Sequence, residues 1–163
     1  MTHKIEQNKA KNLPKMKLLT TAAILATSAT AEFDLYHQKN IFGQPLKTCS
    51  TDPMTGYLRD GKCTMMSSDQ GTHVVAAVMD QKFLDYTKAM GNDLSTPRAW
   101  GFPGLKPGDK WCLCQFRWKQ AVDAGFGPKV DLDATNEHAL TYLDINLLKE
   151  YAIDKDNDYR NSL

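Results

Sequence analysis

The folded part of the chain contains a continuous apolar run between His73 and Met79, whose middle residues are all valine or alanine. A run of this length without alternation is typical of a strand that is covered on both faces. Asp80 follows as a suitable N-cap, apolar positions then recur at helical spacing, and Gly91 provides a stop. The pattern therefore predicts a buried strand followed directly by a helix.

The same succession is predicted again further along the chain. Trp111 to Phe116 has the pattern of a short strand that runs into a helix ending near Ala124. Val130 to Ala134 alternates apolar and acidic residues, as a half-exposed strand does. Thr135 or Asp133 is expected to cap a short helical turn after this strand.

A last helix, from Ile145 to Ala152, is expected behind Asp144 as its N-cap. Three strands that are each followed by a helix predict an α+β fold with an α/β-like order of elements. The expected architecture is a small mixed or parallel sheet of three to four strands with packed helices and long ordered loops.

Two long segments are predicted to be ordered loops. Residues 48–71 are dense in Ser, Thr, Asp, Gly and Pro, and residues 92–110 carry prolines and glycines that exclude regular structure. The segment before them, Asn40 to Leu46, is interrupted by Gly43 and Pro45 and can be at most an edge strand. Long irregular connections inside a small domain are usually functional or disordered, so these loops are the first place to look for a site.

The length of 163 residues fits one domain, expected at about residues 40–153, with a polar tail over 154–163. Residues 1–31 are a predicted leader: basic residues precede a moderately apolar stretch that ends in Ala29-Thr30-Ala31. This is the layout of a signal peptide cleaved before Glu32, which predicts a periplasmic or secreted protein. A transit peptide or a surface helix would leave the chain organellar or cytoplasmic. N-terminal sequencing of the mature protein distinguishes these alternatives.

Charge and general motifs remove several classes of function. A formal net charge of +1 gives no electrostatic reason to expect a nucleic-acid partner. The mature chain has no run of about 18 apolar residues, so no membrane span is expected. The phosphate-binding loop, the dinucleotide-binding glycine motif, the Gly-x-Ser-x-Gly elbow and the His-Glu-x-x-His helix are absent from the sequence. The oligomeric state stays open.

The four cysteines, Cys49, Cys63, Cys112 and Cys114, raise three alternatives. Cys112 and Cys114 would share one face of a strand with Cα atoms about 6.5 Å apart and parallel side chains, so we do not expect them to bond each other. They can instead face Cys49 and Cys63. The four thiolates could then hold zinc, with His73 as a substitute ligand, form disulfides, or stay reduced as small core residues. The last alternative is the most ordinary.

Cys114 has a further property, because it lies where the second helix should begin. A helix N-terminus stabilises a thiolate, and Arg117 one turn on would add to this effect. Cys114 is therefore a weak candidate for a catalytic nucleophile; no other catalytic residue is indicated.

Polar loop residues suggest a ligand site at one rim of the sheet. The candidates for ligand binding are Asp52, Arg59, Asp60, Asn92, Asp93, Ser95 and Arg117. Polar loops at a sheet edge are a usual place for a small-molecule pocket, and an arginine suits a carboxylate or phosphate. The alternative is that these side chains only cap turns, as Asp, Asn and Ser often do.

Three blocks of sequence resemble one known family. They are Cys49-Ser50-Thr51-Asp52-Pro53 followed by Arg59-Asp60-Gly61 and Cys63, then residues 91–97, then residues 102–114 with Arg117-Trp118 behind them. In this order they resemble domain-of-unknown-function family 2237 over about residues 40–153. The resemblance implies a shared fold and no established activity. It also implies that Ala76 stands where many relatives have another cysteine.

We therefore expect a small-molecule-binding protein with a loop-built polar pocket, whose ligand is unknown. The first alternative is a cysteine-based zinc or thiol-redox enzyme, and the second is a structural interaction module. Whether the protein is an enzyme stays open, and zinc is the one cofactor that the residues suggest.

Overall fold

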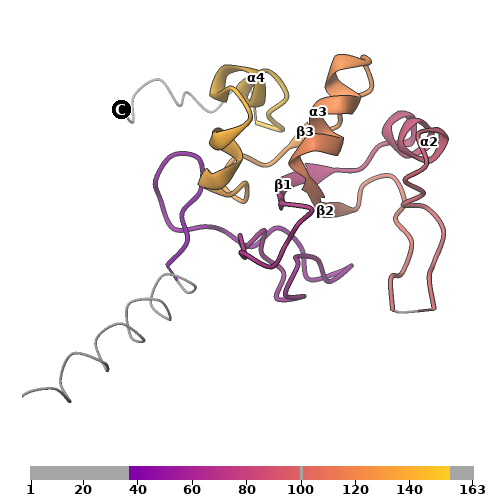
Figure 1. Cartoon of the computed structure of the whole chain (residues 1–163), viewed down its shortest axis with the longest axis horizontal. Helices are drawn as coiled ribbons and strands as arrows, with labels where there is room; N and C mark the ends of the chain where they lie inside the picture. Colours follow the sequence, from indigo (N-terminus) through magenta and orange to yellow (C-terminus); the bar gives the residue numbers. More distant parts are fainter. Residues whose placement is uncertain (1–36, 100, 155–163) are drawn as a thin grey trace, which may run out of the picture. The chain divides into compact units, whose positions relative to one another are not determined.

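The structure is a computed structural model that describes residues 37–99 and 101–154 (Figure 1). The predicted leader lies outside the described residues, as does all of the polar tail except Asp154. The described elements, in order, are β1 (His73–Val78), α2 (Gln81–Ala89), β2 (Lys110–Cys114), α3 (Gln115–Asp123), β3 (Lys129–Val130), the 3-10 helix η1 (Glu137–Thr141) and α4 (Ile145–Glu150). This confirms the predicted α+β class. No described helix has both the length and the apolar character needed to cross a bilayer.

The three strands form one sheet in the order β2-β1-β3, and both pairings are antiparallel. The mixed or parallel pairing expected from the order of elements is therefore corrected. The reason lies in residues 92–109, which return the chain to the end of β1 that it left. There the Met79 amide donates to the Asp109 carbonyl at 2.8 Å, and the Gly108 amide donates to the Met79 carbonyl at 2.8 Å. Because β2 starts beside the end of β1, it must run antiparallel to it.

The two faces of the sheet have different covers. Val75 and Ala77 of β1 and Leu113 of β2 belong to the main core. Ala76 and Cys112, which alternate with them and lie opposite each other, belong to a separate small cluster. Helix α3 packs on β1 and β2 on one side in Figure 1, and the irregular segment before β1 lies on the other. The predicted strand covered on both faces is thus confirmed, with helices on one face and loops on the other.

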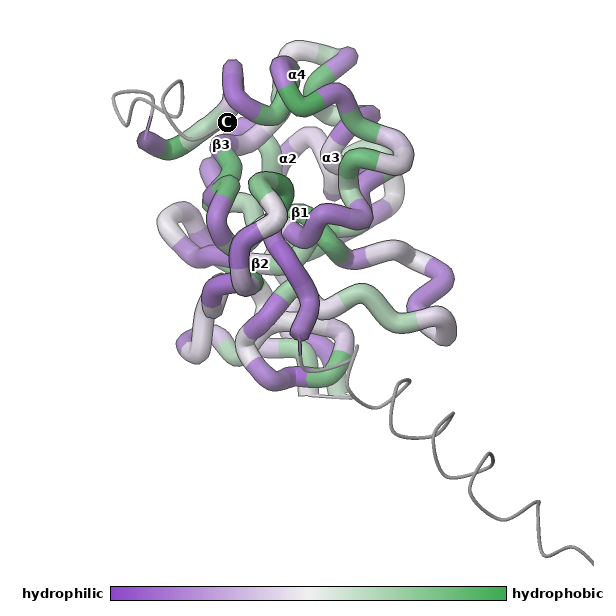
Figure 2. Tube along the Cα trace, turned by 90° about the vertical axis from the view of Figure 1, so that its left-hand side faces the viewer, coloured by the Kyte–Doolittle hydropathy of each residue, from purple (hydrophilic) through white to green (hydrophobic). Residues whose placement is uncertain are grey.

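Helices α2 and α3 each bury three residues, whereas α4 buries only Leu148. Hydrophobic positions recur among hydrophilic ones along α3 and α4 in Figure 2. Asp80 caps α2 as predicted, because its carboxylate accepts the Phe83 amide at 2.8 Å. Asp144 likewise caps α4, accepting the Asn146 amide. The fully buried Trp118 donates its indole N–H to the Pro128 carbonyl at 3.1 Å, which satisfies its polar end inside the core.

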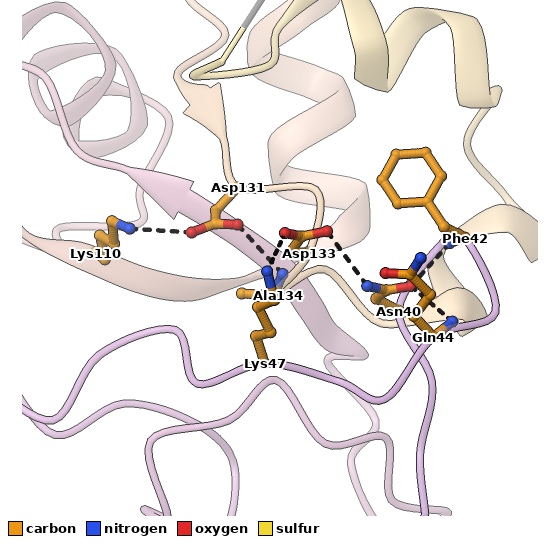
Figure 3. Close-up of polar contacts among 8 residues, drawn as sticks. All are labelled: Asn40, Phe42, Gln44, Lys47, Lys110, Asp131, Asp133 and Ala134. Carbon is orange, nitrogen blue, oxygen red and sulfur yellow. Dashed lines mark hydrogen bonds and ion pairs between the residues drawn. The ribbon is translucent and has the colours of Figure 1, made fainter. Parts of the chain in front are cut away.

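The third strand is shorter than predicted. Val130, Leu132 and Ala134 are all buried, as their alternation indicates, but only Lys129 and Val130 are in the strand. Asp131 ends it, because its carboxylate accepts the Ala134 amide at 3.3 Å and closes a turn (Figure 3). Asp133 in the same turn pairs with Lys47 and thereby holds the first described segment in place.

Thr135 does not cap the following turn, which is capped by Asn136. The Thr135 hydroxyl is buried and bridges two elements instead. It accepts the Ala76 amide of β1 at 3.1 Å and donates to the Asp131 carbonyl at 2.8 Å. This one hydroxyl therefore joins the turn after β3 to the middle strand.

Replacing Thr135 with valine should lower the free energy of unfolding by about 1–3 kcal/mol, because the isosteric side chain leaves a buried amide and carbonyl without their partner. Urea unfolding followed by circular dichroism measures the change. Thr141→Val is the matched control: it removes an exposed hydroxyl that donates to the His138 carbonyl, and it should change the free energy by less than about 0.5 kcal/mol. Equal losses in the two variants would contradict this role of Thr135.

Candidate functional site

The segment from Cys49 to Cys63 is an ordered loop that closes on itself, as predicted. The amides of Cys49 and Ser50 donate to the Gly61 carbonyl at 2.8 and 3.2 Å, and the Gly61 amide donates to the Thr55 carbonyl at 3.0 Å. Gly61 adopts a left-handed φ of 82°, and a Cβ there would lie 3.0 Å from the Ser50 carbonyl oxygen. Only glycine fits this crossing of the two ends of the loop.

Two bonds fasten this loop to the sheet. Cys63 forms a disulfide with Cys112 of β2, with their Cα atoms 5.3 Å apart. The Thr55 hydroxyl accepts the Cys112 amide at 2.9 Å and is itself buried. Since β2 is an edge strand, the loop satisfies a backbone donor on this strand that no neighbouring strand pairs.

The disulfide brings a third sulfur close. The sulfur atoms of Cys49, Cys63 and Cys112 all lie within 4.8 Å of one another, and the three residues are buried. As predicted, Cys112 does not bond Cys114. The expectation that both of them face Cys49 and Cys63 holds for Cys112 alone. The expectation that all four cysteines stay reduced is corrected, because Cys63 and Cys112 are bonded. Among the described residues, Cys114 and His73 are not part of this group, which we call the sulfur cluster.

The thiol of Cys49 is strongly held in its protonated form. Burial is the largest influence that raises its pKa to about 12; the Asp131 carboxylate also raises the pKa, whereas the Lys110 ammonium lowers it. Lys110 and Asp131 form an ion pair of 3.0 Å beside the cluster (Figure 3). The sulfur cluster therefore contains one disulfide and one neutral thiol at neutral pH.

Cys114 is half-buried and free, and it occupies the N-cap position of α3. Its side chain makes no capping hydrogen bond. Arg117 donates to the Gln120 side chain at 3.1 Å and to the Met90 carbonyl at 3.5 Å. The role of Cys114 as a nucleophile stays a prediction.

A cavity of about 550 Å³ lies along the free edge of β2. It is lined by Gly56, Tyr57, Arg59, His73, Gly91, Asn92, Asp93, Leu94, Arg98, Phe102, Trp111 and Cys112. These residues come from both predicted loops, from the start of β1 and from β2. The expected convergence of the two loops is therefore present, and three of the predicted ligand-binding residues, Arg59, Asn92 and Asp93, line the cavity.

The other predicted ligand-binding residues lie elsewhere. Asp60 lines a second cavity of about 490 Å³, together with Lys39 and Lys62. Within the described part of the chain, Asp52, Ser95 and Arg117 do not line the first cavity. The Ser95 amide donates to Asp93 at 2.9 Å, so this residue belongs to a turn, as the alternative reading of these polar side chains supposes.

Arg59 is held over the cavity by its backbone and by an aromatic ring. It is a non-glycine residue with a left-handed φ of 56°. Its guanidinium donates to the Gly56 carbonyl at 2.9 Å and lies 4.9 Å from the centre of the Trp111 ring. A left-handed residue of this kind is conformationally strained, which is common where a side chain must be aimed at a ligand.

Asp93 anchors the second loop at the rim of the cavity. The Thr96 hydroxyl, 2.7 Å away, is the largest influence that lowers the pKa of Asp93 to about 2, and Lys88 lies 3.4 Å away. A carboxyl with a lowered pKa stabilises the fold at pH values above its ordinary pKa of 3.8, and this contribution is lost as the pH falls towards 2. The loop is therefore anchored throughout the neutral range.

Asp69 and His73 form a pair that sequence reasoning missed. The Asp69 side chain is 1% exposed and lies 2.7 Å from His73 Nδ1, while the His73 side chain is 41% exposed and lines the cavity. Asp69 also accepts the backbone amides of Gly71 and His73. Because a carboxylate accepts, Nδ1 is the donor and Nε2 is left for a ligand. The available signal was an Asp four residues before a His, at the start of a strand.

The family described as "Uncharacterized protein conserved in bacteria (DUF2237)" matches residues 39–152. The chain belongs to this family. No curated protein matches the chain. The DUF2237 match covers the first cavity, the sulfur cluster and the lining of the second cavity except for His37 and Gln38.

Ala76 is the position at which the sequence resemblance to DUF2237 implies a cysteine in many relatives. In this chain it is buried in the same small cluster as Cys49, Cys63 and Cys112, and it pairs with Cys112 across the sheet. A methyl group therefore lies beside the three sulfurs of this chain.

Iodoacetamide at pH 8 should alkylate Cys114 and spare Cys49, because with a pKa of about 12 only about one Cys49 thiol in ten thousand is ionised at that pH. Cys49 labelling should then rise about tenfold per pH unit. The neutral Cys49 thiol stabilises the fold fully at pH values below its ordinary pKa of 9.0, and this contribution is lost as the pH rises towards 12. Peptide mass spectrometry reads both sites, with Cys114→Ser as control; equal labelling of the two cysteines at pH 8 would be incompatible with the cluster.

Arg59→Gly should be more stable than Arg59→Ala by about 1 kcal/mol, since glycine adopts a left-handed φ without the strain that alanine retains. Both variants lose the same guanidinium contacts, so the comparison isolates the backbone. Thermal unfolding of the two proteins measures the difference. Greater stability of the alanine variant would show that Arg59 is not in this conformation.

Proposed function

We propose that the protein binds a small anionic molecule that carries a carboxylate or phosphate next to an apolar or aromatic part. The observation that carries this proposal is the meeting of two arginines in one cavity. Arg59 belongs to the first loop and Arg98 to the second, and both line the same space beside His73. Arginine side chains match the planar geometry of carboxylate and phosphate oxygens.

The other walls suit the non-polar part of such a ligand. Tyr57, Leu94, Phe102 and Trp111 line the cavity, and Phe102 packs edge-on against Trp111 at 5.4 Å between ring centres. A volume of about 550 Å³ is within the usual range of about 300–1,000 Å³ for small-molecule sites. The lining therefore combines apolar side chains with two arginines and one carboxylate, that of Asp93, and a few placed charges beside apolar walls are usual in a specific pocket.

His73 supports a defined orientation of the ligand. Asp69 fixes its ring through Nδ1, so Nε2 can make one directed hydrogen bond to a group in the cavity. The net charge of the chain is only +1, and so the attraction for an anion comes from this local arrangement and not from the overall field of the protein.

Export is a second part of the proposal. The leader pattern that ends at Ala31 supports cleavage before Glu32. The Cys63–Cys112 disulfide is the covalent state that an oxidising compartment maintains. A mature chain that begins at Glu32 is the expected result of N-terminal sequencing.

Anion binding is tested by titrating the oxidised protein with aromatic and aliphatic carboxylates and phosphates, each paired with its neutral amide or alcohol, and following amide chemical shifts. At least one anion should bind tenfold or more tightly than its neutral partner, a difference of about 1.4 kcal/mol. Arg98→Gln and Arg59→Gln should each remove most of this preference.

Arg117→Gln is the matched control, because it removes the same charge from a residue outside the cavity. Its preference for anions should equal that of the original protein. Equal binding of anions and neutral partners, or an equal loss in Arg117→Gln, would exclude the proposed role of the two cavity arginines.

A further inference from the structure

The sulfur cluster contains one cysteine more than its disulfide needs. Cys63 and Cys112 are bonded, and Cys49 lies with its sulfur within 4.8 Å of both. The position of Cys49 is fixed from both sides: its amide donates to the Gly61 carbonyl at 2.8 Å, and its side chain is buried among Ala76 and Ala134. Three sulfurs held together by the backbone of one loop and one strand form a preorganised set of soft donors.

We propose that reduction of the Cys63–Cys112 disulfide converts the sulfur cluster into a binding site for one thiophilic metal ion, Zn²⁺ or Cu⁺, held by Cys49, Cys63 and Cys112. Thiolates select these ions over hard cations such as Mg²⁺ and Ca²⁺. Within the sulfur cluster of the oxidised protein only the Cys49 sulfur is free, so the same site binds no metal.

The distances are compatible with this set of ligands. Zinc–sulfur bonds of about 2.3 Å place the sulfurs of a tetrahedral site about 3.8 Å apart. The cluster has its sulfurs within 4.8 Å of one another, so Cys49 must approach by no more than about 1 Å while the two sulfurs of the broken disulfide separate. Rotation of cysteine side chains can supply such movements without a change of the loop backbone.

The charges also favour a cation. Burial is the main reason that Cys49 keeps its proton, because an isolated thiolate would lie in a region of low polarity. A bound metal ion removes this obstacle, since its positive charge balances the thiolates and displaces the proton of each thiol. The Asp131 carboxylate, which disfavours the Cys49 thiolate, attracts a cation, and its ion-pair partner Lys110 favours the thiolate.

Among the described residues, no histidine, carboxylate or further cysteine has a ligand atom within 4.8 Å of all three sulfurs, and Ala76 and Ala134 pack in the same buried cluster. Cu⁺ accepts three thiolates alone, whereas Zn²⁺ would take its fourth ligand from water or from a molecule in the adjacent cavity. Cys112 lines this cavity as well as the cluster, so the second route is short.

The redox step is balanced by a dithiol reductant. The dithiol transfers two electrons and two protons, the Cys63–Cys112 bond breaks to give two thiols, and the dithiol becomes a cyclic disulfide. One metal ion then replaces the protons of Cys49, Cys63 and Cys112. A small-molecule disulfide reverses the sequence: it accepts two electrons and is reduced to thiols, the Cys63–Cys112 bond forms again, the ion leaves, and Cys49 takes up a proton from water.

The test compares the oxidised protein with protein that has been reduced by a water-soluble phosphine and freed of it by gel filtration without oxygen before the metal is added. For zinc, Co²⁺ serves as a spectroscopic probe, because Co²⁺ bound to thiolates has a charge-transfer absorption. Zn²⁺ should displace the bound Co²⁺ and abolish this absorption. Cu⁺ is added without oxygen in competition with a chromophoric chelator. The reduced protein should bind one equivalent of at least one of these ions, and the oxidised protein none.

Variants separate the cluster from the remaining cysteine. Cys49→Ser should weaken metal binding at least tenfold after reduction, whereas Cys114→Ser, which changes the free cysteine outside the cluster, should bind as the original protein does. If reduction alone unfolds the protein, addition of the metal should restore its circular dichroism.

Three results would overturn the metal site: no binding of either ion by the reduced protein, an equal loss in Cys114→Ser, or no recovery of a protein unfolded by reduction. Anion binding is measured on the oxidised protein and does not involve the metal. The proposed ligand pocket and the metal site can therefore fail independently.

Discussion

The attachment of residues 49–63 to strand β2 is the constraint on which the rest of the site depends. A three-stranded antiparallel sheet has two faces, and helix α3, with the main core, covers one of them. The second face is covered by a loop without regular structure, which must satisfy its own backbone groups to be buried. It does so through the crossing at Gly61, the Thr55 hydroxyl and the Cys63–Cys112 disulfide. The disulfide joins residues that are 49 apart in sequence. In the loop-entropy account, the restriction of the unfolded chain raises the free energy of unfolding by about 4 kcal/mol.

Both proposed sites follow from that attachment. On one side of the loop, Arg59 is turned over Trp111 and faces the second loop across the cavity. On the other side, Cys49 is brought to the disulfide and completes the sulfur cluster. One short segment thus supplies the charge of the anion pocket and the spare thiol of the metal site. The second loop contributes less to the fold but fixes the opposite wall of the pocket through Asp93 and its bond with Thr96.

The sequence predicts the local features of this molecule well. The buried strand at His73, the capping of α2 by Asp80 and the two ordered loops depend on neighbouring residues, and each is present. The meeting of the two loops, which brings Arg59 and Asn92 to one cavity, was also predicted. These features are determined by periodicity and by turn residues, which a single sequence displays directly.

Features that depend on distant parts of the chain were not predictable in the same way. The direction of β2 depends on where residues 92–109 return the chain, and the loop composition does not reveal this. The end of β3 at Asp131 depends on a side chain that closes a turn, although the burial pattern continues through Ala134. The choice of Cys63 and Cys112 as the bonded pair, with Cys49 left as a thiol, depends on the crossing at Gly61. The Asp69–His73 pair was missed because a buried acid looks like any other loop residue in sequence.

Amide hydrogen exchange of residues 49–63, measured before and after reduction of the metal-free protein, tests the central role of the attachment most directly. The account predicts that reduction increases exchange in this loop and at Cys112 by at least tenfold, while α4, on the other face of the sheet, keeps its protection. Unchanged protection of the loop after reduction would show that the disulfide does not hold it on the sheet.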